Sequence, residues 1–173
     1  MTVTETARLR LRLLNRLDAP FVLELLTDPA FRANVGDRGV HDLPSAGRYI
    51  VDGPGASYAQ HGFGMFVVER KEDARPIGMC GLLRRDSHPD VEIGFAMLPA
   101  GRGQGYALEA ATASLRLGIE RFGLTRIVAI TAPDNMRSIR ILEQLGFRFD
   151  RMVRFTADGE SRLFIFEPPA HGP

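Results

Sequence analysis

The stretch Val91-Glu-Ile-Gly-Phe-Ala-Met-Leu-Pro-Ala-Gly-Arg-Gly-Gln-Gly-Tyr-Ala107 decides how the chain folds. It begins with the apolar and β-branched residues of a strand, ends in a cluster of glycines, and is followed by the Ala- and Leu-rich run 108–118. A strand, a glycine turn and a helix start in this order form a site for an anion. The first amides of a helix have no partner within the helix, and the helix dipole adds partial positive charge there.

Three residues of the turn support a phosphate site. Gly103 and Gly105 have no Cβ, so the backbone can take positive φ and a phosphate can approach closely. Arg102 adds a planar, permanently charged donor at the edge of the turn. From these residues alone, a glycine-rich turn that binds nothing is the open alternative.

Two familiar phosphate motifs do not fit this stretch. The P-loop ends in Gly-Lys-Ser/Thr, and the only lysine of the chain, Lys71, lies far from the turn. The dinucleotide fingerprint needs a third glycine where this chain has Leu108, and it follows an early strand. A dinucleotide-binding oxidoreductase domain is therefore disfavoured.

Composition is that of an ordinary globular protein. The chain has 173 residues, 45% hydrophobic and 25% charged, which suits one domain over residues 1–173. A net charge of +1 gives no support for nucleic-acid binding. No run reaches the ~18 apolar residues of a membrane span, and residues 1–6 lack the features of a signal peptide, so we expect a cytoplasmic protein without a membrane partner.

The single cysteine, Cys80, lies in the apolar run Ile77-Gly-Met-Cys-Gly-Leu-Leu83. Free cysteines in such runs are usually buried, and a buried thiol is inert. We therefore expect a structural residue rather than a nucleophile. The sequence predicts no metal site.

Periodicity and turn signals predict an α+β fold. The predicted strands are 8–13, 63–69, 76–84, 91–98, 125–131, 147–155 and 160–166. The predicted helices are 18–26, 28–31, 44–60 (one kinked helix or two), 103–122 and 134–145, and a turn at 157–159 joins the last two strands. A strand that follows a helix crossover pairs parallel to its predecessor, so 125–131 should lie parallel to 91–98 in a mixed, mostly antiparallel sheet of six to seven strands.

The motif Arg102-x-x-Gly105-x-Ala107 resembles the acyl-CoA pyrophosphate loop of the GNAT superfamily of N-acetyltransferases, and the order of elements is similar to the fold of that family. Further matches resemble the branch that includes the ribosomal-protein N-terminal acetyltransferases. They are Thr6-Ala-Arg-Leu-Arg-Leu-Arg12, Glu109-Ala110, Asn135-x-x-Ser138 and Leu145-Gly146-Phe147.

The resemblance implies a site for acetyl-CoA, with its pyrophosphate on the glycine turn and its pantetheine arm along the end of the central strand, which splays from its neighbour in this family. The cofactor-binding residues that it implies are Ala96, Met97, Leu98, Arg102, Gly103, Gln104, Gly105, Tyr106, Ala107, Asn135 and Ser138. Two of these have structural alternatives: Asn135 as a helix cap and Tyr106 as a packing residue.

The implied reaction is direct attack of a primary amine on acetyl-CoA in a ternary complex. Glu92 is the candidate base, with His88 and Asp90 as fallbacks, and Ser138 the candidate donor to the departing thiolate. A strand residue that faces solvent or pairs with an arginine is the alternative for Glu92. Leu142 stands where many family members carry a tyrosine general acid, so the resemblance does not assign a general acid.

The acceptor site is expected between the helical segment 18–60 and the last strand pair, with Glu24, Asp28 and Asp37 as candidates for gripping an amine. A protein N-terminus, an aminoglycoside, a polyamine and an amino-acid derivative all fit equally. Relatives are often dimers, so a homodimer is possible. The alternative from another class is an acyl-CoA-binding module without catalysis.

Overall fold

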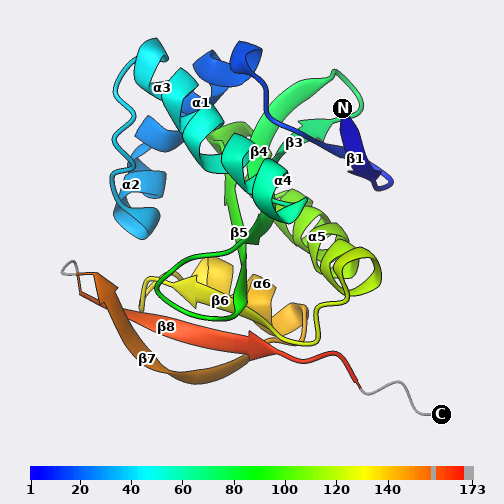
Figure 1. Cartoon of the computed structure of the whole chain (residues 1–173), viewed down its shortest axis with the longest axis vertical. Helices are drawn as coiled ribbons and strands as arrows, with labels where there is room; N and C mark the ends of the chain where they lie inside the picture. The colour runs from blue at the N-terminus through cyan, green and yellow to red at the C-terminus, as the bar shows by residue number, and fades with distance from the viewer. Residues whose placement is uncertain (157–158, 170–173) are drawn as a thin grey trace.

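One eight-stranded sheet organises the chain in a computed structural model that describes residues 1–156 and 159–169. The strand order is β1-β2-β3-β4-β5-β6-β8-β7 (Figure 1). The strands are β1 (Thr2–Glu5), β2 (Leu9–Arg12), β3 (Met65–Arg70), β4 (Arg75–Leu83), β5 (Val91–Met97), β6 (Ile127–Thr131), β7 (Arg148–Thr156) and β8 (Gly159–Phe166). Among the described residues only β5 and β6 pair parallel, so the predicted mixed, mostly antiparallel sheet is confirmed. The predicted turn at 157–159 falls largely outside the described residues.

The sheet has one strand more than predicted. The additional strand, β1, is four residues long and pairs antiparallel with β2 at the edge of the sheet. Its sequence, Thr-Val-Thr-Glu, is too short to show a clear alternation, and its place in the fold depends on the turn at residues 6–8 that brings β2 beside it. A strand of this length forms because its partner is already there.

Six α-helices surround the sheet: α1 (Ala19–Thr27), α2 (Pro29–Val35), α3 (Leu43–Ile50), α4 (Ala56–His61), α5 (Tyr106–Phe122) and α6 (Met136–Gln144). The segment 43–61 is one continuous helical stretch, because a π-helical turn, Val51–Gly55, joins α3 to α4. Pro54 explains the wider turn, since proline has no N–H for the α-helical ladder.

The helix that follows the glycine turn begins later than predicted. The sequence predicts a start at residue 103, whereas α5 begins at Tyr106 because Gly103 and Gly105 adopt φ of +74° and +78°. Those values lie in the left-handed region and cannot continue a right-handed helix. The predicted end is confirmed, with Gly123 in the left-handed conformation after Phe122.

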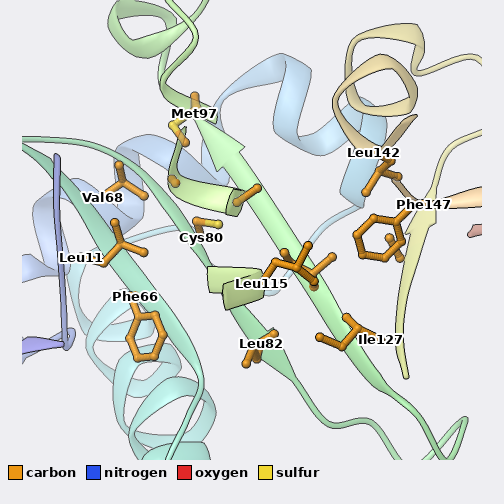
Figure 2. Packing of buried hydrophobic residues seen from close by; sticks show 14 of the residues in the cluster. Leu11, Phe66, Val68, Cys80, Leu82, Met97, Leu115, Ile127, Leu142 and Phe147 are labelled. Atoms are coloured by element: carbon orange, nitrogen blue, oxygen red, sulfur yellow. The ribbon is translucent and has the colours of Figure 1, made fainter. Parts of the chain in front are cut away.

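Helices cover both faces of the sheet. Alternate residues of a strand point to opposite faces, and in β3 and β4 they belong to two different apolar clusters. Phe66 and Cys80 lie in a cluster with residues of α5 and α6, some of which Figure 2 labels. Val67 and Met79 lie in a second cluster with residues of α1 and α3. Burial raises the pKa of the Cys80 thiol to about 12, as expected for an inert structural cysteine.

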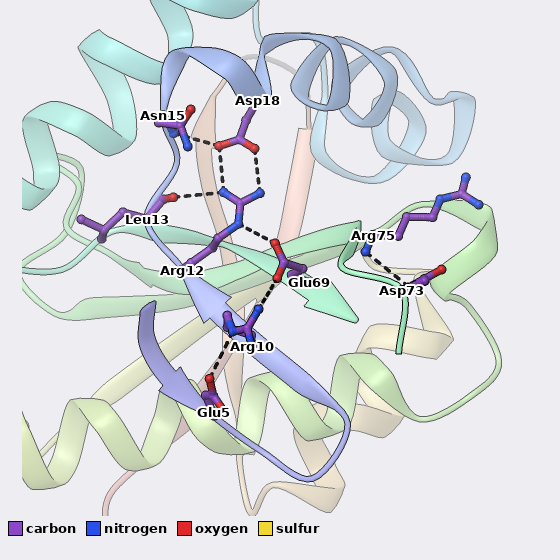
Figure 3. A network of polar contacts seen from close by, with 9 residues as sticks. All are labelled: Glu5, Arg10, Arg12, Leu13, Asn15, Asp18, Glu69, Asp73 and Arg75. Carbon is purple, nitrogen blue, oxygen red and sulfur yellow. Dashed lines mark hydrogen bonds and ion pairs between the residues drawn. The ribbon is translucent and has the colours of Figure 1, made fainter. Parts of the chain in front are cut away.

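A charged network ties the start of the chain to β3 (Figure 3). The guanidinium of Arg12 binds Asp18 with both terminal nitrogens, at 3.0 and 2.8 Å, and donates through Nε to Glu69 at 2.8 Å. Arg10 donates to the other oxygen of Glu69 at 2.8 Å. Both carboxylates are buried, so Arg12 pairs with two charges that are removed from water, and Arg10 shares Glu69 with it.

Replacing Arg12 with methionine should therefore lower the free energy of unfolding by about 3 kcal/mol, because it leaves Asp18 without its cation and Glu69 with one of two. Urea denaturation of wild type and variant measures the difference. Arg116→Met is the matched control, since the ion pair of Arg116 with Glu120 lies on the exposed surface of α5 and should contribute little. Equal losses in both variants would contradict the assignment.

Candidate active site

The two parallel strands at the centre of the sheet separate soon after they meet. β5 pairs with β6 only at Val91–Ile127 and Glu92–Val128. Beyond these pairs, β5 runs on to Met97 and β6 to Thr131 without further residues paired between the two strands. A cleft of about 1440 Å³ occupies this region and reaches from the helices α2–α4 to α6 and β8. Its wall includes the predicted site residues Glu92, Ala96, Asn135 and Ser138, together with Leu142.

Beyond Glu92, the edge of β5 on the side of β6 has no strand partner. Leu98 donates its N–H to Ile77 at 2.8 Å, on the β4 side. Backbone groups alternate in direction along a strand, so those of Ala96 also face β4, while those of Phe95 and Met97 face the open edge. Of the three residues predicted to pair with the cofactor arm, only Met97 has this orientation, and its carbonyl accepts Nε of Arg102 at 3.0 Å. Pairing of this edge with a cofactor arm stays a prediction.

The glycine turn ends in an uncapped helix. Gly105 is the N-cap of α5, and no side chain of the described residues caps this helix. By contrast, Asp28, Asp42 and Asn135 cap α2, α3 and α6 with their side chains. The first amides of the longest helix therefore stay available to an anion. Tyr106 is buried in the core and Ala107 packs against it, so the side chains of these two residues serve packing while their amides belong to the turn.

A clamp from the first hairpin holds this turn. Glu109 accepts hydrogen bonds from the Thr6 hydroxyl at 2.5 Å and from the backbone N–H and Nε of Arg8 at 3.0 and 2.7 Å. Arg8 also donates to the carbonyl of Gln104 at 2.9 Å, and its guanidinium lies 4.4 Å from the centre of the Tyr106 ring. The sequence motifs that contain Thr6, Arg8 and Glu109 are thus partners across the fold, which sequence reasoning noted separately but did not connect.

Arg102 is held away from the turn by a second tie. Its Nη2 binds Asp28 at 2.6 Å and its Nε donates to the carbonyl of Met97 at 3.0 Å. Asp28 also accepts the amides of Ala30 and Phe31 at the start of α2. The loop before the glycine turn is therefore fastened, through Arg102 and Asp28, to the start of α2, a helix that lines the cleft.

The ion pair between Asp28 and Arg102 reduces the number of carboxylates that could bind an amine. Asp28 is committed to Arg102 and to capping α2. Glu24 is exposed and does not line the cleft, whereas Asp37 does. Asp37 is thus the one of the three predicted carboxylates with access to a ligand.

Glu92 is buried at the point where β5 and β6 separate, with 5% of its surface exposed. Arg85 binds both of its oxygens, at 2.6 and 3.4 Å, and Nε2 of His88 lies 3.5 Å from Oε2. The arginine-paired alternative describes the contacts of this residue, and its role as a base stays a prediction. Asp90, by contrast, pairs with Arg126 at 3.2 Å.

Asn135 caps α6, since its side chain accepts the amide of Ser138 at 3.3 Å. The half-buried Ser138 also lines the cleft, one turn before Leu142. Leu142 is fully buried in the core, where its apolar side chain has no proton to donate.

Within residues 1–156 and 159–169 the structure has neither a metal-binding cluster nor a helix that could span a membrane. No group of three or more His, Cys, Asp or Glu side chains is placed to hold a metal ion. No helix there is long and apolar enough to cross a membrane.

Residues 8–148 match the acetyltransferase (GNAT) domain family, and the chain belongs to that family. The uncharacterised N-acetyltransferase YjdG of Bacillus subtilis is 34% identical over 87 residues, which are 50% of this chain and 52% of that protein. The chain thus spans about half the length of the first curated relatives that it matches.

Solved structures share the fold over almost the whole chain. An acetyltransferase from Agrobacterium tumefaciens has a TM-score of 0.82 and 27% identity, covering 96% of this chain and 95% of that one. Ribosomal-protein-S5-alanine acetyltransferase from Vibrio fischeri has a TM-score of 0.77 over 98% of both chains, and its 17% identity shows a common fold.

The clamp at Glu109 should depend on pH. Burial raises the pKa of Glu109, but hydrogen bonds from Thr6 and Arg8 lower it by more. The pKa of this carboxyl therefore lies below its ordinary value of 4.5. A carboxyl whose pKa is lowered by folding stabilises the protein above its unfolded pKa, and this contribution is lost as pH falls through the folded value. Glutamine at 109 cannot make that contribution at any pH.

The difference in unfolding free energy between wild type and Glu109→Gln should thus be largest near pH 7 and shrink below about pH 4.5. Urea denaturation over a pH series measures it. Glu120→Gln, at an exposed position of the same helix, is the control and should show little difference at any pH. A Glu109→Gln difference that stays constant down to pH 3 would argue against the clamp.

Proposed function

We propose that this protein is an acetyl-CoA-dependent N-acetyltransferase that catalyses direct attack of a primary amine on the thioester in a ternary complex. The observation that carries the proposal is the uncapped amide turn at Gly103–Ala107, which stands at the end of a splayed strand pair. The pyrophosphate would lie on the amides of the turn and the pantetheine arm along the unpaired edge of β5 at Phe95 and Met97, where the Met97 carbonyl already accepts from Arg102. Arg102 would contribute by fixing the loop, since its side chain is occupied by Asp28.

The chemistry requires a neutral amine, support for the developing oxyanion and a proton for the thiolate. We assign the first task to Glu92, acting through water, because it lines the cleft where the two strands part. Arg85 and His88 hold its carboxylate in place. Ser138 is the proposed proton donor, since its hydroxyl lines the same cleft and makes no hydrogen bond to the described residues.

The proposed acceptor is a primary amine, either a protein N-terminus or a small molecule. Asp37 lies on the side of the cleft formed by α2–α4 and is available to bind a cationic group. Because one structural neighbour is named a ribosomal-protein-S5-alanine acetyltransferase, peptides that begin with alanine belong in an acceptor panel. A homodimer is a further prediction, for which sedimentation is the direct measurement.

Two observations favour a second candidate function, an acyl-CoA-binding module without catalysis. The candidate base is ion-paired to Arg85, and Leu142 offers no proton. Both features weaken acid–base catalysis without affecting the cofactor turn. Release of free CoA in the presence of an amine would exclude this function.

Gly105→Glu should abolish acetyl-CoA binding, because it places a carboxylate where the phosphates belong. Wild type at 100 times its Kd should gain about 2.7 kcal/mol of stability from the ligand, and the variant should gain none. Thermal-shift titration measures both.

Gly105→Ala is the matched control, since it imposes the same backbone strain at φ +78° and its Cβ would meet Arg8 only at 3.5 Å. It should keep most of the ligand-induced shift. A normal shift with Gly105→Glu, or none with wild type, would remove the basis of the phosphate site.

Glu92→Gln should lower kcat by about 10²- to 10⁴-fold, the usual contribution of a general base, with acetyl-CoA affinity retained. Thiol release against a panel of amines gives the rates. Asp90→Asn is the control, because that carboxylate pairs with Arg126 instead of facing the cleft, and its rate should stay near wild type. Unchanged turnover in Glu92→Gln would assign the residue to structure alone.

A further inference from the structure

Thr131 carries a hydroxyl that nothing in the described protein satisfies. It is the last residue of β6, with 7% of its surface exposed. Its Oγ1 is buried and has no hydrogen-bond partner among residues 1–156 and 159–169. Buried hydroxyls almost always have a partner, because leaving one unpaired is costly. The residue also lines the cleft, which offers a place from which a partner can come.

The position of Thr131 along the cleft defines which part of a ligand it can reach. Glu92 is level with Val128, and Thr131 lies three residues further along β6. At about 3.3 Å per residue, the hydroxyl is roughly 10 Å beyond the level of Glu92, in the direction in which β5 runs toward the glycine turn. It is therefore too far from Glu92 to touch a group reacting there and lies between that point and the phosphate site.

The side chain of Thr131 lies on the face of the sheet that packs against α5 and α6. Alternation along β6 places it on the same side as Ile127 and Ala129, which pack in the cluster that includes residues of α5 and α6. Nearby parts of the cleft wall, Phe95, Ala129 and Leu142, are apolar. A polar group of a ligand in this part of the cleft would find the threonine hydroxyl in otherwise apolar surroundings.

We propose that Thr131 is a cofactor-binding residue whose hydroxyl forms a hydrogen bond with an amide of the pantetheine arm of acetyl-CoA. This inference rests on the proposed function and adds a residue that neither the glycine turn nor the catalytic pair includes. The amide supplies the partner that the buried hydroxyl lacks in the free protein. The bond contributes to holding the arm in register between the phosphate site and Glu92.

The test compares Thr131→Val with Thr131→Ser, because valine keeps the shape and removes the hydroxyl, while serine keeps the hydroxyl. Calorimetric titration with CoA should give a Kd about 3- to 10-fold higher for the valine variant, the usual effect of one neutral hydrogen bond. The serine variant should bind nearly as wild type. Adenosine 3′,5′-bisphosphate, which carries phosphates but no arm, should bind equally to all three proteins.

Stability supplies an independent readout. Without ligand, Thr131→Val should melt at or above the wild-type temperature, because the substitution removes an unpaired polar group. A Kd for CoA unchanged by valine would overturn the inference and point to an ordered water as the partner. Equal weakening of CoA and the bisphosphate would also overturn it, since the effect would then be general to the fold. Failure of wild type to bind CoA would instead overturn the proposed function, and this inference with it.

Discussion

The early parting of β5 and β6 is the constraint on which the site depends. Two paired residues on each strand are enough to fix their parallel register, and after Glu92 the strands diverge. A sheet that stayed paired would bury the backbone groups of Phe95 and Met97 in its own ladder. Because the two strands separate instead, the edge of β5 that leads into the glycine turn has no strand partner. Backbone groups without a strand partner can form hydrogen bonds with a ligand.

The opened sheet needs support from outside the two strands. The Thr6–Arg8–Glu109 clamp fixes the start of α5 from one side, and the Asp28–Arg102 pair fixes the loop before it from the other. Both use charged groups that are only partly buried, where the desolvation cost of an ion pair is moderate. The turn thus keeps its shape without using its own amides, which leaves them for a ligand.

Local signals in the sequence predicted the parts of this arrangement that depend on neighbouring residues. The glycine turn, the cap at Asn135 and the end of α5 at Gly123 each follow from a few adjacent residues with known backbone preferences. The pairing of Arg102 with Asp28 could not be predicted in this way, because it joins side chains 74 residues apart. The same holds for the isolation of the Thr131 hydroxyl, which depends on every element packed around it.

The double role of Asp28 affects how substitutions at this position are interpreted. Asp28 lies between α1 and α2; its carboxylate caps α2, which lines the cleft, and also anchors Arg102 before the glycine turn. A change at this position alters α2 and the loop with Arg102 together, so a measured loss cannot be attributed to one of them from a single kinetic constant. When related sequences are compared, residues 28 and 102 should be considered together as one pair.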